Sequence, residues 1–263
     1  MASKDQIKKV ILEVAGNPES GAVFNLADKW ADAIVGLFPA NSQGDDILLY
    51  PDESRSKPFL IWHNLRQQSE RPVVDGVKRP NRCLADYVAN QASGIVDYVG
   101  CFALTTGHGV EEKVAQFLAK HDDYSAIMLK ALADRLAEAF AELMHWRVRT
   151  DLWGYAAGEQ LSTEELIDEK YQGIRPAPGY PACPDHQVKF AMFHAMKADE
   201  IGMTLTESLA MNPASSVSGF YLANPNAMYF NVGKVSSDQV GDFARRTGKS
   251  PEEVRRSLAS LLD

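Results

Sequence analysis

The sequence predicts an α+β protein, in which an antiparallel or mixed sheet lies beside long helices. Two observations carry this prediction: short apolar runs are separated by turn-forming residues, and other segments place apolar residues near a 3.6-residue period. The two kinds of segment do not alternate regularly, so the pattern typical of a parallel βαβ sheet is missing. A length of 263 residues, with 45% hydrophobic and 24% charged residues, is typical of a folded globular protein.

The apolar runs predict six strands, the first three of which form an antiparallel meander. The fourth run is apolar without interruption, which is typical of a strand covered on both faces, and we expect it to be the central strand. In chain order the runs are AIVGLFPA (33–40), DILLY (46–50), FLIW (59–62), VDYVGCFALTT (96–106), SVSGFYLA (216–223) and AMYFNVGKV (227–235), with a further strand expected at LTESLAM (205–211).

The longest helical pattern spans residues 124–149, with acidic residues before it and Arg147 and Arg149 at its end, as the helix dipole favours. Three capping boxes predict where other helices begin, since a serine and a Glu or Gln three residues later satisfy free N–H groups. The boxes are Ser162 with Glu165, Ser236 with Gln239, and Ser250 with Glu253. The apolar residues near the 3.6-residue period of the long helix are Ile127, Leu129, Ala131, Leu132, Leu136, Phe140, Leu143 and Met144.

Charge and hydropathy exclude several classes of protein. Lys+Arg total 27 and Asp+Glu total 35, the net charge is -8, and no basic run occurs, so we expect no nucleic-acid binding. No apolar stretch approaches about 18 residues and no targeting signal stands at the start, so we expect no membrane insertion and a cytoplasmic location. Cys83, Cys101 and Cys183 are odd in number and far apart, which favours reduced packing thiols over disulfides.

The segment RPAPGYPACPDH (175–186) is the strongest candidate for a binding site. Its prolines fix φ and keep the chain extended, so its backbone groups lack helical partners and must meet water, side chains or a ligand. Arg175 offers a planar fork for a carboxylate, Gly179 allows close approach, and Tyr180 offers a flat amphipathic ring. These parts fit a small zwitterion with an aromatic portion. The alternative is a rigid loop that only connects two elements.

Two other residue pairs are candidates. Asp134 and Glu138 stand four apart and therefore share one helix face, either as a solvated acidic stripe paired with Arg135 or Lys130, or as a contact surface. Tyr229 and Phe230 are adjacent in a predicted strand, so their rings point to opposite faces. One ring is expected in the core, and the other is expected to line a pocket.

Motifs of several enzyme classes do not occur. Cys183-x-x-His186 resembles half of a zinc site, but structural zinc needs four ligands and no second pair has matching spacing, so no metal is expected. The sequence shows no Ser-His-Asp or Cys-His arrangement, no G-x-G-x-x-G fingerprint and no phosphate loop. Conventional hydrolase, NAD-linked and kinase functions are therefore disfavoured.

Six ordered blocks resemble the activation, or S-adenosylmethionine-binding, domain at the C-terminus of cobalamin-dependent methionine synthase. The resemblance extends from about residue 31 to the end, and the two longest blocks are its most specific part. The blocks are VGLFPANSQGDDI (35–47), LRQQ (65–68), RCLADYV (82–88), HDDYSAIMLKALADRLAEAFAE (121–142), YQGIRPAPGYPACPDH (171–186) and LTESLAMNPASSVSGFY (205–221).

The resemblance implies a C-shaped α+β domain with a central antiparallel sheet, and a methyltransferase role limited to the activation step of methionine synthase. In the family, an electron from a flavoprotein and a methyl group from S-adenosylmethionine together restore methylcobalamin after the cofactor has been oxidised. The resemblance therefore implies S-adenosylmethionine as the bound donor. It also implies two partners, a cobalamin-binding domain or protein of the synthase and a flavoprotein reductant.

The resemblance also implies roles for residues of the proline-rich segment. Arg175 would hold the carboxylate of the donor, and Ala177 and Gly179 would supply backbone contacts. Tyr180 would border both the donor and the approaching corrin.

The resemblance also assigns roles to four residues outside the proline-rich segment. Tyr229 and Phe230 stand where the family has an aromatic pair that contacts the donor, and Phe230 lacks the hydroxyl of the tyrosine found in some relatives. Asp134 and Glu138 stand at acidic helix positions that face the site or the cobalamin domain.

The first thirty residues depart from the family. Relatives have a segment of the type Asp-Trp-Thr-Pro-Phe, whose aspartate pairs with the amino group of the donor, and nothing before residue 31 resembles it. We therefore expect an atypical segment at 1–30 and an activation-like domain at 31–263. Losing one charge-assisted contact would weaken donor binding by about one to two decades. Three interpretations stay open: a reactivation module, a non-catalytic domain that docks on a corrinoid protein, and a fragment of a split synthase.

Overall fold

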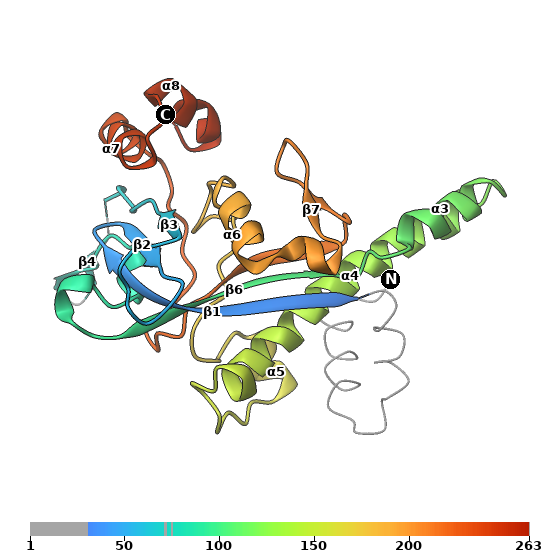
Figure 1. Cartoon of the computed structure of the whole chain (residues 1–263), viewed down its shortest axis with the longest axis horizontal. Helices are drawn as coiled ribbons and strands as arrows, with labels where there is room; N and C mark the ends of the chain where they lie inside the picture. Colours follow the sequence, from blue (N-terminus) through green and yellow to red (C-terminus); the bar gives the residue numbers. More distant parts are fainter. Residues whose placement is uncertain (1–30, 71–72, 75, 263) are drawn as a thin grey trace. The chain divides into compact units, whose positions relative to one another are not determined.

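The computed structural model describes residues 31–70, 73–74 and 76–262, and it confirms the α+β class (Figure 1). The chain forms two compact units. The first unit contains the described residues up to 36, then 102–172 and 196–218, and the second contains 37–101, 173–195 and 219–262. The atypical segment expected at 1–30 lies outside the described residues.

The main sheet has five strands in the order β3-β2-β1-β6-β9. The first three strands pair antiparallel, with Ala40 opposite Leu49 and Leu49 opposite Leu60, which confirms the predicted meander. β6 has a neighbouring strand on each side and is buried from its third residue onward. The central position that we expected for β6 is occupied by β1. The strands are β1 (Asp32–Gln43), β2 (Asp46–Leu49), β3 (Leu60–His63), β6 (Asp97–Thr105) and β9 (Ser216–Tyr221), and a separate pair consists of β4 (Val73–Val74) and β5 (Val77–Lys78).

Two strand predictions are wrong. The stretch 205–211 is not one strand but belongs to a hairpin of β7 (Thr204–Leu205) and β8 (Met211–Asn212), because Thr206 and Ala210 close a turn by a 2.9 Å backbone hydrogen bond. The stretch 227–235 forms no strand. Its N–H groups bond instead to irregular segments, such as that of Val232 to the carbonyl of Pro181 at 2.9 Å.

The long helix is α4 (Asp123–Arg147), close to its predicted span, and it continues into one π-helical stretch (Val148–Leu152). Its buried face differs from the prediction. The residues of the 3.6-residue apolar pattern are mainly exposed in the first half of the helix, with Ile127 68% and Leu132 51% exposed. The buried residues are Ala126, Ala133, Ala137, Ala139, Ala141, Glu142 and His145.

The alanine face is explained by helix packing within the first unit. Helix α3 (Val110–Leu118) packs on α4 through Val110 and Val114, which meet Ala126 and Ala133. Small side chains allow two helix axes to approach closely, so alanine faces the neighbouring helix while larger apolar residues stay outside. The Thr106 hydroxyl also donates a 2.7 Å hydrogen bond to the carbonyl of Ala133. The 3.6-residue spacing of apolar residues therefore predicted the helix correctly, but it did not predict which face of the helix is buried.

Two of the three capping boxes are confirmed. Ser162 caps α5 (Thr163–Ile167) and Ser250 caps α8 (Pro251–Ser257), each with its glutamate returning the hydrogen bond. Ser236 does precede α7 (Ser237–Thr247), but it makes no capping bond. The Gln239 amide instead exchanges two hydrogen bonds with the backbone of Arg66, at 2.7 and 2.9 Å. The other helical elements are α6 (Val188–Met196) and the 3-10 turns Leu84–Tyr87, Gln91–Ser93, Ala198–Ile201 and Ala259–Leu261.

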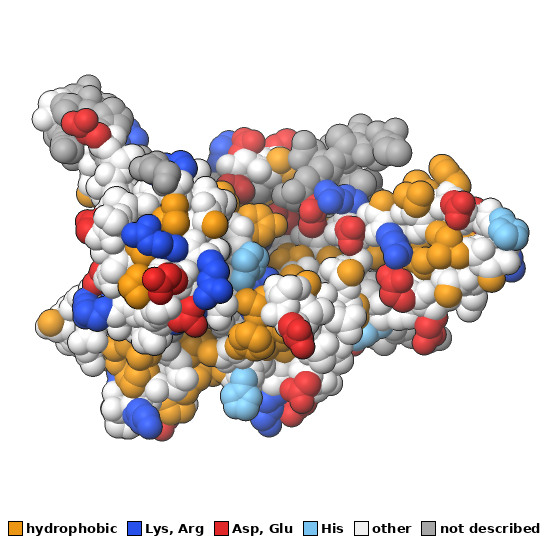
Figure 2. Space-filling model, turned by 90° about the horizontal axis from the view of Figure 1, so that it is seen from above, with side chains coloured by type: hydrophobic (Ala, Val, Ile, Leu, Met, Phe, Trp, Pro, Cys, Tyr) orange, Lys and Arg blue, Asp and Glu red, His pale blue; other side chains and the backbone are white. Residues whose placement is uncertain are grey.

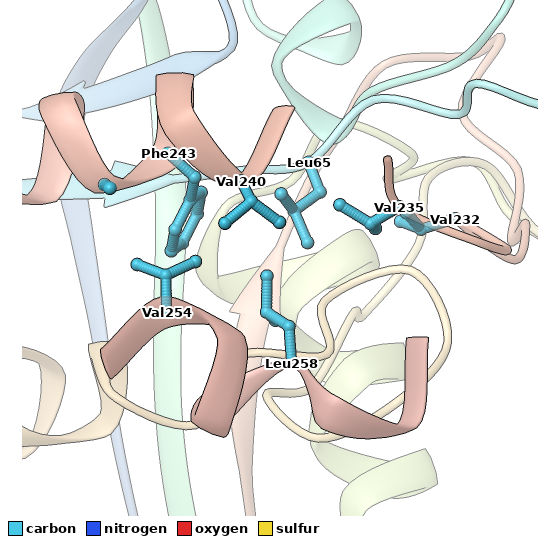
Figure 3. Close-up of a cluster of buried hydrophobic side chains, with 8 residues drawn as sticks. Leu65, Val232, Val235, Val240, Phe243, Val254 and Leu258 are labelled. Atoms are coloured by element: carbon cyan, nitrogen blue, oxygen red, sulfur yellow. The ribbon is translucent and has the colours of Figure 1, made fainter. Parts of the chain in front are cut away.

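A buried apolar cluster fixes the C-terminal helices within the second unit. Val240 and Phe243 of α7 point toward Val254 of α8 and Leu258 just after it, with Leu65 beside them (Figure 3). Phe230 packs against the edge of this cluster. None of the helices in the described part of the chain is both long and apolar enough to cross a lipid bilayer.

Candidate functional site

The proline-rich segment 175–186 lies in the second unit and contains neither helix nor extended strand. It begins after Ile174, which forms an isolated antiparallel bridge with Leu222, and regular structure resumes at α6. The prediction that the prolines keep this stretch out of a helix is confirmed.

Several backbone groups of the segment form hydrogen bonds within the segment or to neighbouring chain. The carbonyl of Pro176 accepts from the N–H of Phe220 at 2.9 Å, and the N–H of Gly179 donates to the carbonyl of Cys183 at 2.7 Å. Within the residues that the structure describes, the N–H of Ala177 and the carbonyl of Gly179 have no hydrogen-bond partner. The segment is therefore tied to the fold at several points, and its unbonded backbone groups include a donor and an acceptor at the two positions expected to give backbone contacts.

Tyr229 holds the start of the segment in place. Its hydroxyl accepts a 3.0 Å hydrogen bond from the N–H of Arg175, although the two residues are 54 positions apart. Its ring is 39% exposed, and the Tyr180 ring is 66% exposed. The ring of the neighbouring Phe230 lies 6.4 Å from the Tyr87 ring and packs against the buried cluster. One ring joins the core and the other does not, as expected, but an irregular stretch rather than a strand separates them.

The variant Tyr229→Phe is expected to weaken ligand binding at the segment, because it removes the acceptor that fixes the Arg175 backbone. The loss of one hydrogen bond predicts a change of about three- to tenfold in the dissociation constant for S-adenosylmethionine. Calorimetric titration checks this, with Tyr98→Phe, which removes another partly exposed tyrosine hydroxyl in the second unit, as the control. An unchanged affinity in Tyr229→Phe would contradict the positioning role.

Gly179 is needed because the segment folds tightly upon itself. Its φ is +96°, and a Cβ added there would overlap the imidazole of His186. Desolvation lowers the pKa of His186. Burial also raises the pKa of the Cys183 thiol to about 12, so this thiol stays protonated and unreactive. Both residues of the Cys-x-x-His pair thus have packing roles in the segment.

The described residues contain no group of three His, Cys, Asp or Glu side chains that could hold a metal ion. Cys83, Cys101 and Cys183 are all buried and free. Burial raises the pKa of the Cys83 thiol as well, to about 12. The three cysteines therefore behave as small apolar core residues.

Asp134 and Glu138 lie on α4 in the first unit, where each has a local partner. The hydroxyl of Ser215 donates a 2.8 Å hydrogen bond to Asp134, and Arg135 pairs with Glu138 at 2.8 Å. Lys130, the other partner considered for them, pairs instead with Glu111 at 3.2 Å. The contact-surface and ligand roles of the two carboxylates stay predictions.

Sequence reasoning missed a buried ion pair after α4. Arg149 was assigned to the helix end as a dipole-compensating cation, but its guanidinium is 1% exposed and binds Glu159 through two 2.7 Å hydrogen bonds. The ring of Tyr171 covers the guanidinium at 4.2 Å. No periodic pattern predicts this pair, because the π-helical stretch turns Arg149 away from its ordinary helical direction.

Together, these features define an α+β domain that presents a rigid, irregular segment with an arginine, free backbone groups and tyrosine rings. Residues 23–248 match the sequence model of the family described as vitamin B12 dependent methionine synthase, activation domain. The chain belongs to this family of activation domains, as the resemblance of the six blocks predicted. It is also similar to the crystal structure of the MetH reactivation domain bound to AdoHcy, with a TM-score of 0.85 and 43% sequence identity. That similarity covers 99% of this chain and 88% of the other.

Proposed function

We propose that this chain binds S-adenosylmethionine and donates its methyl group in the reductive methylation of cob(II)alamin held by a partner domain or protein. One observation carries the proposal: the similar MetH reactivation domain is bound to AdoHcy, which is the donor molecule without its methyl group. A site that holds AdoHcy has the shape to hold the donor as well. The rigid segment of this chain supplies groups of the right chemistry for that ligand.

The proposed contacts follow from the geometry of the segment. Arg175 binds the carboxylate of the donor, because a guanidinium matches a carboxylate with two parallel hydrogen bonds. The free N–H of Ala177 and the free carbonyl of Gly179 can pair with the donor and acceptor edges of adenine. The exposed ring of Tyr180 and the half-exposed ring of Tyr229 offer flat apolar surfaces to the nucleoside. Because several backbone groups and the prolines already restrict the segment, it loses less ordering entropy on binding than a flexible loop would.

The chemistry of the proposed reaction is a methyl transfer. One electron from a flavoprotein reduces the corrinoid substrate, the S–CH3 bond of the sulfonium breaks, the methyl group bonds to cobalt, and AdoHcy leaves. The residues of the proline-rich segment hold the donor in place for this transfer. Asp134 and Glu138 are proposed to face the donor or the corrinoid partner.

The surface of α4 supports docking of a protein partner. Tyr124 is 75% and Ile127 68% exposed there, and Figure 2 shows hydrophobic side chains among the charges of the α3–α4 surface, at the right of the view. Exposed apolar groups mixed with charges are typical of a protein contact surface. The proposed partner is the cobalamin-binding domain or protein of methionine synthase.

A second function is a non-catalytic domain that docks on a corrinoid protein without using the donor. Phe230 favours it modestly, since the hydroxyl of some relatives is missing and the ring packs against the core. The absence of the family aspartate also favours it, but the first thirty residues lie outside the described part.

A methylation assay distinguishes the two functions. The chain is mixed with a cobalamin-binding partner domain, a chemical reductant and S-adenosylmethionine, and formation of methylcobalamin is followed by its absorbance. The reactivation function predicts formation that requires both the chain and the donor. Partner binding without donor-dependent methylation would support the docking function instead.

A further inference from the structure

A hollow on the second unit brings together polar side chains from residues 249–257 and Gln187, which directly follows the proline-rich segment. Its volume is about 460 Å³, and Gln187, Lys249, Glu253, Arg256 and Ser257 line it. This volume lies within the range of small-molecule sites. Every lining residue carries a polar or charged group that can contact a polar ligand.

Two cations in this hollow have no direct partner. Among the described residues, neither Lys249 nor Arg256 forms an ion pair or a side-chain hydrogen bond. The neighbouring Arg246 is fully engaged, with ion pairs to Asp46 and Asp242. Two unpaired cations that meet in one hollow are notable in a chain of net charge -8.

The carboxylate in the hollow is already occupied. Glu253 accepts hydrogen bonds from the N–H and the hydroxyl of Ser250, both at 2.8 Å, as part of the helix cap. These bonds are the main reason that the pKa of Glu253 is lowered, and the positive charges of Arg256 and Lys249 add to it. The positive charges of Lys249 and Arg256 outnumber the single negative charge of Glu253, so the hollow can still attract an anion.

The frame of the hollow is rigid. Val254 of α8 and Leu258 just after it lie in the buried cluster of Figure 3, which fixes the helix, while Glu253 and Arg256 stay exposed. Lys249 follows α7, whose last turn ends at Gly248. Gln187 closes the hollow from the turn before α6.

We propose that this hollow binds a phosphate group, either free phosphate or the terminal phosphate of a small ester. The guanidinium of Arg256 offers a planar fork, Lys249 a compact positive charge, and Gln187 a neutral amide donor, which together match the oxygens of a dianion. This site goes beyond the proposed methyl-donor function and uses none of the residues of the donor segment.

Nuclear magnetic resonance of the labelled full chain tests the site. Inorganic phosphate and methyl phosphate are titrated separately, with chloride adjusted to hold the ionic strength constant. We expect saturable amide shifts confined to Gln187 and residues 249–257 with at least one of the two anions. Saturation by both favours recognition of the phosphate group alone, and saturation by methyl phosphate only identifies an ester as the ligand.

Two matched variants sharpen the test. Arg256→Ala is expected to weaken phosphate binding by about tenfold or more, because it removes a charge-assisted contact. Arg255→Ala, an equally exposed arginine on the same helix outside the hollow, is expected to change it by less than about twofold. Equal losses in both variants, or no saturable shift with either anion, would overturn the proposal. The affinity for S-adenosylmethionine should be the same in both variants. A negative result for the phosphate site can therefore be distinguished from a negative result for the methyl-donor site.

Discussion

The variant Arg149→Ala is expected to lower the free energy of unfolding by about 3 to 5 kcal/mol. The Arg149 guanidinium is buried, donates a hydrogen bond to each of the two carboxylate oxygens of Glu159, and lies over the Tyr171 ring. Removing the arginine leaves the Glu159 carboxylate, itself only 6% exposed, as an unpaired buried charge. The cost of that charge, rather than the loss of attraction alone, makes the effect large.

Urea denaturation followed by circular dichroism measures the effect, and the chain offers a matched control two residues away. Arg147 forms an exposed ion pair with Asp151 at 2.8 Å, with the side chains 46% and 61% exposed. Arg147→Ala should therefore cost less than about 1 kcal/mol. A double change of Arg149→Met and Glu159→Leu should recover much of the stability. If Arg149→Ala cost no more than Arg147→Ala, the pair would not be the anchor that the structure indicates.

The variant Gly179→Ala is expected to abolish S-adenosylmethionine binding at the concentrations that saturate the unchanged chain. The residue sits at φ +96°, where an L side chain is strained by about 1 to 3 kcal/mol, and the added methyl group overlaps the His186 ring. Relief of that overlap must displace the segment that carries Arg175 and Tyr180. Because Gly179, Tyr180 and His186 are exposed, the strain falls at the surface and the fold should survive.

Calorimetry with the donor, beside a melting curve, measures this prediction. The double variant Gly179→Ala and His186→Ala removes the overlapping ring but keeps the unfavourable φ, so it should recover donor affinity in part. Gly158→Ala is the control, because no atom would meet its Cβ and its φ is not in the left-handed region. Full donor affinity in Gly179→Ala would show that the segment does not form the site.

The parts of the fold that the sequence predicted well are those governed by local rules. The meander of β1, β2 and β3 follows from apolar runs and turns, and the two glutamate capping boxes begin their helices where expected. The strand expected at 227–235 fails because tertiary hydrogen bonds to Pro181 and Leu261 replace a ladder. The buried side of α4 was missed because helix proximity selects alanine, which periodicity of large apolar residues does not reveal.

Some features of the candidate site were also predictable from local sequence, and others depend on the folded chain. Prolines and glycine act on their own backbone, so the extended form of 175–186 was predictable from composition. The hydrogen bond from Arg175 to Tyr229 was not, since it joins residues far apart in the chain and depends on an irregular path after β9. The roles of Ala177 and Gly179 gain support from their free backbone groups, which only the folded chain reveals.

Isothermal titration calorimetry of S-adenosylmethionine into the chain and into Arg175→Ala tests the central claim most directly. We expect saturable binding by the unchanged chain and a dissociation constant at least about tenfold higher in Arg175→Ala, with Arg255→Ala as the control for loss of an arginine elsewhere. Heats that do not saturate with millimolar donor, or equal affinity in all three proteins, would contradict the claim that the segment 175–180 binds the methyl donor.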